Sequence, residues 1–119
     1  IAHGCCISLV FHRHALEKVG FFNSVRIAAD LEYIERLTLA FGPFSVARLR
    51  MPLLFGRARS GSLTASEEFG ITRTGFTQPR HLYHHFSRDY HDKIADGETP
   101  FMPFPLEQRT FPAPNVILP

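Results

Sequence analysis

The chain has 119 residues, of which 45% are hydrophobic and 20% are charged, and its formal net charge is +2. This length suffices for one domain with a modest core, and no apolar run is long enough to span a membrane. A net charge of +2 is too small to indicate nucleic-acid binding by itself. Because the chain begins at Ile1 rather than at a methionine, we expect a fragment of a longer protein.

Residues 4–11 are almost continuously apolar, which predicts a strand covered on both faces. Cys5 and Cys6 are neighbours in this segment, an arrangement poor for a disulfide, so we expect reduced, buried thiols and a cytoplasmic location. Attachment to the inner membrane is the alternative location. Residues 12–19 predict a short helix that ends at Gly20.

Residues 30–41 predict the central helix, which Gly42 and Pro43 end. Apolar side chains recur there at steps of three and four residues, and we expect the polar side chains between them to face solvent. The apolar set is Leu31, Tyr33, Ile34, Leu37, Ala40 and Phe41, and the outward set is Glu32, Glu35, Arg36 and Thr38. Glu32 and Arg36 are one turn apart and can form an ion pair.

Asp30 stands where this helix begins, after a loop whose one charge is Arg26. It can be an N-cap, whose side-chain oxygen accepts a backbone N–H and has no further role. It can also be a general base that takes a proton from an attacking hydroxyl. Spacing alone does not choose between these roles.

The second half of the chain alternates extended and turn-forming segments before another helix. Residues 44–51 predict a strand, residues 53–59 can extend again after Pro52, and residues 60–66 open a loop that runs to residue 77. Pro79 fits the first turn of a helix that ends at Gly97 and docks on the sheet. The apolar stripe of this helix is Leu82, Tyr83, Phe86, Tyr90 and Ile94.

Residues 99–119 hold six of the nine prolines, at positions 100, 103, 105, 112, 114 and 119. This content excludes a helix or a central strand, yet the segment is too apolar for a free linker. We therefore expect two parts: residues 1–98 as the folded domain, and residues 99–119 as a tail that wraps over it or over a missing half.

Two segments, HALEKVGFFNSVRIAADLEYIERLTLAFGP (14–43) and PLLFGRARSGSLTAS (52–66), follow the order and approximate spacing of a known family. They resemble the acceptor-side half of family 2 nucleotide-sugar glycosyltransferases. The resemblance implies an α/β fold, a partial GT-A (Rossmann-like) mixed sheet flanked by helices, with the N-terminal nucleotide-binding half absent. Asp30 matches the catalytic base of the family, whereas Ala29 replaces the glutamate before it, which puts a second carboxylate in doubt.

The resemblance also implies a reaction and its partners. It is inverting, hexosyltransferase-like transfer of sugar from a nucleotide-sugar donor to a glycan or lipid-linked acceptor, as in polysaccharide biosynthesis. The donor diphosphate would be held by Arg57, Arg59, Ser62 and Thr64. A divalent metal, Mg or Mn, would bind ligands mostly in the missing half, so that this chain supplies no metal ligand and is inactive alone. Alternatively, residues 57–66 form a solvated loop whose arginines bind no ligand.

Other interpretations stay open. His81 and His85 are one helical turn apart, as paired metal ligands can be, but a solvated helical face gives the same spacing. Arginines and twelve phenylalanines could grip single-stranded nucleic acid in a non-catalytic binding module. Most phenylalanines fall on predicted inward stripes, so we expect no nucleic-acid partner. A transferase domain that has only a scaffolding role is the third alternative.

Overall fold

The computed structural model describes residues 9–49, 51, 55, 59–72 and 75–119. Its main elements are three α-helices: α1 (Arg13–Val19), α2 (Ala29–Phe41) and α3 (Gln78–Ala95). Two short 3-10 helices, η2 (Leu63–Ala65) and η3 (Asn115–Ile117), complete the helical elements of the described segments. The strands β1 (Ile71–Thr72) and β2 (Gly75–Phe76) form an antiparallel pair in which Ile71 lies opposite Phe76.

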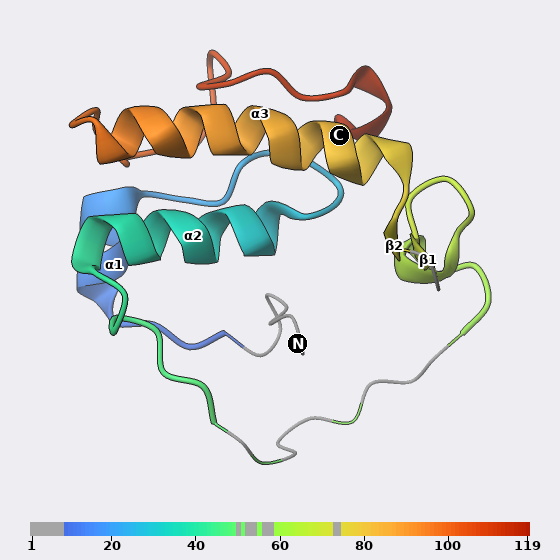
Figure 1. Ribbon diagram of the computed structural model, residues 1–119, viewed down its shortest axis with the longest axis horizontal. Helices are drawn as coiled ribbons and strands as arrows, with labels where there is room; N and C mark the ends of the chain where they lie inside the picture. The colour runs from blue at the N-terminus through green and yellow to red at the C-terminus, as the bar shows by residue number, and fades with distance from the viewer. Residues whose placement is uncertain (1–8, 50, 52–54, 56–58, 73–74) are drawn as a thin grey trace.

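Helices α2 and α3 lie side by side and run in the same direction, and α1 packs on α2 (Figure 1). The loop of residues 20–28, which joins α1 to α2, passes between α2 and α3 in this view, and much of the C-terminal tail runs along the opposite side of α3. Met102 and Ile117 of the tail nevertheless reach the loop side, where they bond to Phe21 and Arg26. The first turns of α2 and α3 therefore lie toward the same end of the molecule. No helix in the described part of the chain is long and apolar enough to cross a membrane.

The expected mixed sheet flanked by helices is wrong, because the described residues form a mostly helical structure with one short strand pair. Residues 9–11 and 44–49 are not strands, while residues 4–8 and most of 53–59 lie outside the described residues. Phe44 is 98% exposed and Leu49 is 72% exposed, and within the described residues this apolar segment pairs with no strand. Alternating apolar residues favour an extended backbone, but a strand also needs a partner for its hydrogen bonds.

The three predicted helices are confirmed. They could be predicted because residues close in the sequence set their ends. Helix α1 ends at Gly20 and α2 ends at Gly42, each with a positive φ that suits glycine. Helix α3 carries Pro79 in its first turn, where a missing N–H costs nothing. The expectation that α3 docks on a sheet is wrong: it docks on α2 and on the tail.

The buried side chains form two clusters. The first joins residues 27–28, α3 and the tail, and the second joins α1 to α2. In the first cluster the ring of Phe111 stacks on Tyr90 at 5.1 Å between centroids and also contacts Tyr83. Met102 and Ile117, at 1% and 0% exposure, belong to the same cluster. The tail therefore packs on the helical domain, which is one of the two expected placements.

Candidate functional site

The loop of residues 20–28 is held by the tail along its length. Phe21 N–H donates to the Met102 carbonyl at 2.8 Å, and Met102 N–H donates to the Val19 carbonyl at 3.0 Å. Further along, Arg26 N–H donates to the Ile117 carbonyl at 2.9 Å. These bonds tie the first and last parts of the loop to two separate points of the tail.

A buried side-chain group holds the middle of the same loop. Asn23 is 4% exposed, and its Nδ2 donates to the Tyr83 hydroxyl of α3 at 3.2 Å. Arg109 of the tail donates to Asn23 Oδ1 at 3.3 Å and to the Ser24 carbonyl at 2.9 Å. Burial raises the pKa of the Tyr83 hydroxyl, which keeps it neutral. The backbone that leads to α2 is therefore positioned by both α3 and the tail.

Ala28 ends this loop in a left-handed conformation, with φ of 63°. A residue with a Cβ seldom adopts this region, at a cost of about 1 kcal/mol, and it persists where packing over-determines it. Ala28 is 5% exposed and packs in the first cluster beside Ile27, which provides that packing. The sharp turn at Ala28 directs the chain into the first turn of α2.

Asp30 is the second residue of α2, as the sequence places it, but the N-cap is Ala28. The half-buried Asp30 accepts the Leu31 backbone N–H through Oδ1 at 3.0 Å. No ion pair involves its carboxylate within the described ranges of the chain. A carboxylate at a helix N-terminus is stabilised by the helix dipole and can still take a proton. Among the described residues, the Leu31 N–H is the hydrogen-bond partner found for Asp30, so its second oxygen can accept another proton donor.

Arg80, in the first turn of α3, shares this end of the molecule. It is 6% exposed, and its Nε donates to the Phe69 carbonyl at 2.5 Å. Burial lowers the pKa of Arg80, and the negative charge of Asp30 opposes that change. Sequence reasoning missed Arg80 as a neighbour of Asp30, because the packing of α3 on α2 brings them together.

Phe69 follows the hydroxyl-rich segment of residues 60–66 and belongs to the first buried cluster. Its side chain packs with Ile27 and Ala28, and the Arg26 guanidinium lies 5.5 Å from its ring centroid. The chain that follows the predicted diphosphate ligands therefore contacts the loop that precedes α2. Of those ligands, Arg59 is exposed and Ser62 is half-buried, Thr64 lies in η2, and Arg57 lies outside the described residues.

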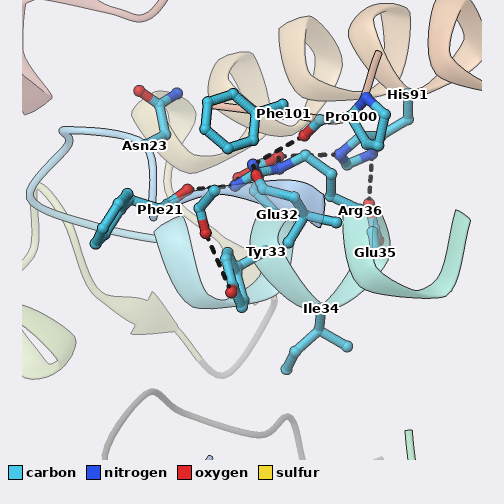
Figure 2. Close-up of polar contacts among 12 residues, drawn as sticks. Phe21, Asn23, Glu32, Tyr33, Ile34, Glu35, Arg36, His91, Pro100 and Phe101 are labelled. Carbon is cyan, nitrogen blue, oxygen red and sulfur yellow. Dashed lines mark hydrogen bonds and ion pairs between the residues drawn. The ribbon is translucent and has the colours of Figure 1, made fainter. Parts of the chain in front are cut away.

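Glu32 and Arg36 of α2 are buried, which corrects the expectation that they face solvent. Their exposures are 1% and 0%, and Arg36 Nε donates to Glu32 Oε1 at 2.8 Å, so the predicted ion pair is confirmed (Figure 2). Arg36 Nη2 also donates to Glu32 Oε2 at 3.1 Å. In contrast, Phe41, predicted to face inward, is 38% exposed.

The burial of Arg36 is explained by the carbonyl groups around it. Its Nη1 donates to the Val19 carbonyl and to the Pro100 carbonyl at 3.1 Å, and its Nη2 donates to the Phe21 carbonyl at 2.7 Å. Together with the two bonds to Glu32, these use the five N–H donors of the guanidinium. One side chain thus joins α2, both ends of the turn after α1, and the start of the tail.

His91 of α3 completes this group. Its Nε2 lies 3.3 Å from Glu32 Oε1 and its Nδ1 lies 3.0 Å from Glu35 Oε2 (Figure 2). Since both ring nitrogens face carboxylate oxygens, both carry hydrogen, and the imidazole is a cation. Burial lowers the pKa of His91, but the hydrogen bonds to both glutamates outweigh it and raise the pKa to about 9. The histidine is therefore a structural cation between α2 and α3.

The pH dependence of stability should report this cation. A histidine whose folded pKa is about 9 stabilises the fold fully below its unfolded pKa, and the stabilisation is lost as pH rises through about 9. We expect the free energy of unfolding to fall by about 2–3 kcal/mol between neutral pH and pH near 10. Urea unfolding at several pH values between neutral and about 10 measures this fall in the free energy of unfolding. His91→Gln should flatten the profile; an equally steep profile in that variant would assign the effect to other groups.

Metal ligation is not supported by the described side chains. Among residues 9–49, 51, 55, 59–72 and 75–119, no group of three or more His, Cys, Asp or Glu residues could hold a metal ion. His81 and His85 are both exposed on α3, and the half-buried His84 stacks on Phe76 with 5.2 Å between ring centroids. Burial lowers the pKa of His84.

Comparisons of the chain with models of protein families, with curated proteins and with solved structures find no match. The resemblance to family 2 glycosyltransferases therefore stays a prediction from the residues. What the geometry adds is a half-buried carboxylate in the first turn of α2, whose charge acts on the buried Arg80 of α3.

Proposed function

We propose that this chain forms the acceptor-side part of an inverting glycosyltransferase in which Asp30 is the general base. The observation that carries the proposal is the difference between the first-turn carboxylates of α2. Glu32 is 1% exposed and is committed to Arg36 and His91, whereas Asp30 is partly exposed and accepts one neighbouring N–H. Of these two carboxylates, Asp30 is the one available to a substrate.

The reaction needs one proton transfer at this carboxylate. As the acceptor oxygen bonds to the anomeric carbon of the nucleotide-sugar, its proton passes to Asp30. The bond from the anomeric carbon to the diphosphate oxygen breaks, and its electron pair leaves with the diphosphate. Attack opposite the leaving group inverts the anomeric carbon. Because the loop of residues 20–28 is held by α3 and the tail, Asp30 keeps its position during the step.

Positively charged and hydroxyl-bearing residues of the 57–64 stretch suit the leaving diphosphate. Arg59, Ser62 and Thr64 precede Phe69 in the chain, and Phe69 belongs to the same buried cluster as Ala28; Arg57 lies outside the described residues. Arginine forks and hydroxyl donors bind phosphate oxygens well. We assign the nucleotide pocket, and the Mg or Mn ion that such donors commonly need, to a separate N-terminal half. The described residues do not make a metal site, and no step is derived through one.

Asp30→Asn should lower turnover of the complete enzyme by about a hundredfold or more, because asparagine cannot accept the proton. Asparagine keeps an oxygen for the Leu31 N–H, so the fold should be unchanged. Nucleotide-sugar binding should also persist, since the base acts on the acceptor. Steady-state kinetics and donor titration measure both quantities.

The matched control is Asp89→Asn, which makes the same change at an exposed position of α3. It should leave turnover unchanged. If Asp30→Asn weakened donor binding as much as turnover, Asp30 would be a donor ligand and the assigned role would be wrong.

A non-catalytic binding module is the second candidate, and one observation favours it. The expectation that most phenylalanines face inward is wrong: only Phe69 and Phe111 are buried. Six are exposed: Phe21, Phe41, Phe44, Phe55, Phe101 and Phe104. Exposed aromatic rings suit binding to a partner. Absence of any transferase turnover in the complete protein, with Asp30 intact, would favour this candidate.

A further inference from the structure

An open groove of about 480 Å³ lies where α1 meets the C-terminal half of α2. Ala15 and Leu37, which are buried, line it together with Phe11, Phe41 and Val46. It is separate from Asp30, which stands at the opposite end of α2. Most of the lining is apolar, so water in the groove is readily displaced by an apolar side chain.

The groove rests on a rigid aromatic base. Tyr33 is fully buried, stacks on Phe22 with 4.3 Å between ring centroids, and packs against Phe11 at 5.6 Å. Its hydroxyl donates to the Gly20 carbonyl at 3.3 Å. The groove is thus formed before any partner arrives, which reduces the entropy cost of binding.

Large apolar side chains surround the groove without a covering partner among the described residues. Val10, a lining residue, is 96% exposed, and Phe44 is 98% exposed. Exposed apolar side chains gathered beside an apolar groove are typical of an interaction surface. Scattered single residues would carry no such meaning.

The charges around the groove are mostly positive. Lys18 Nζ lies 4.8 Å from the ring centroid of Phe41, so its ammonium stands at the rim. Arg13 and Arg48 are exposed and directly adjoin lining residues in the chain. The carboxylate on this part of α1, Glu17, already contacts His14 Nδ1 at 3.2 Å. A partner that carries carboxylates would therefore be attracted here.

We propose that this groove binds a short acidic segment of a partner protein, one that inserts large apolar side chains between α1 and α2. The apolar side chains fill the groove, and carboxylates beside them meet Lys18, Arg13 and Arg48. This is the arrangement in which an amphipathic peptide lies in an apolar groove with charged edges. The proposal does not depend on the role of Asp30.

Two fluorescent peptides of about twelve residues test it. Both carry leucine and phenylalanine at helical spacing on one face; one has glutamate at the other positions and the second has lysine. Anisotropy titration with the whole 119-residue chain should show saturable binding of the acidic peptide, and binding of the basic peptide about tenfold weaker or less. Raised salt should weaken the acidic complex. Equal binding of both peptides, or binding of neither, overturns the proposal.

Two variants place the binding in this groove. Val10→Asp and Lys18→Glu should each weaken binding of the acidic peptide about tenfold, through lost apolar burial and lost attraction respectively. Val116→Asp is the matched control, since Val116 is 42% exposed and does not line the groove. Thermal unfolding should be alike for the Val10 and Val116 variants. Equal peptide affinity in the Val10 and Val116 variants overturns the proposal. Sedimentation provides a second test: a dimer of this chain that Val10→Asp abolishes would mean that the groove binds a second copy, which also overturns the proposal.

Discussion

Arg36→Met should lower the free energy of unfolding by about 3–5 kcal/mol, because it removes one partner of a fully buried ion pair. Methionine has a similar length but no donor, so Glu32 loses two hydrogen bonds. The carbonyl groups of Val19, Phe21 and Pro100 lose theirs as well. Each buried acceptor left without a donor adds to the loss. Urea unfolding monitored by circular dichroism measures this change.

Arg88→Met is the matched control, because Arg88 is an exposed arginine of α3, and its effect should stay within about 0.5 kcal/mol. A double variant, Glu32→Leu with Arg36→Met, tests the mechanism. It should cost less than the sum of the two single changes, since no unpaired carboxylate is then left between α2 and α3. Simple additivity would show that Arg36 and Glu32 act independently, contrary to their geometry.

Gly20→Ala should cost about 3 kcal/mol or more, for two reasons that act together. Gly20 has a φ of 72°, which disfavours a residue with a Cβ. A Cβ at this position would also overlap the carbonyl oxygen of Met102, which is backbone and cannot rotate away. The close approach of these two residues forms the parallel bridge that holds the tail against the loop of residues 20–28.

Gly42→Ala separates the cost of the positive φ from the cost of the overlap with Met102. Gly42 has a φ of 94°, but a Cβ there meets no atom within 4 Å, so we expect a loss of about 1 kcal/mol from the backbone alone. The excess loss in Gly20→Ala then measures the contact with Met102. Equal losses in the two variants, from urea unfolding of both, would mean that the tail moves away from Gly20 at no cost.

The helices could be predicted from the sequence because their ends depend on neighbours in the chain. Gly20 and Gly42 supply the positive φ values that end α1 and α2, and Pro79 marks the start of α3. Whether the expected sheet forms could not be decided from such local signals. Residues 44–49 have a pattern that favours an extended backbone, but whether a strand forms depends on a partner elsewhere, which no local pattern reveals.

The candidate site was likewise predictable only where it depends on residues close in the sequence. The position of Asp30 near the start of α2 follows from the apolar period after it, and the pairing of Glu32 with Arg36 follows from their spacing. Their burial does not follow, since it depends on carbonyl groups at residues 19, 21 and 100 and on His91 of α3. The i,i+4 pair was a visible signal, but helical spacing shows only that two side chains can meet, not that a third element covers them.

The contacts of the tail also set the order in which the molecule can be completed during synthesis. The bond from Arg26 to Ile117 joins residues far apart in the chain, as does the contact of Arg109 with Ser24, which are 85 residues apart. A nascent chain emerging from the ribosome can form α1 and α2 early, but it cannot fix the loop before Asp30 until residue 117 has left the exit tunnel. A premature stop codon near residue 100 would remove Met102, Arg109 and Ile117 while leaving every residue of α2 and α3 in place. Such a product would leave the loop before Asp30 without the tail's support and would expose the rings of Tyr83 and Tyr90 that Phe111 contacts. Exposed apolar surface of this kind makes it a target for chaperones and proteases.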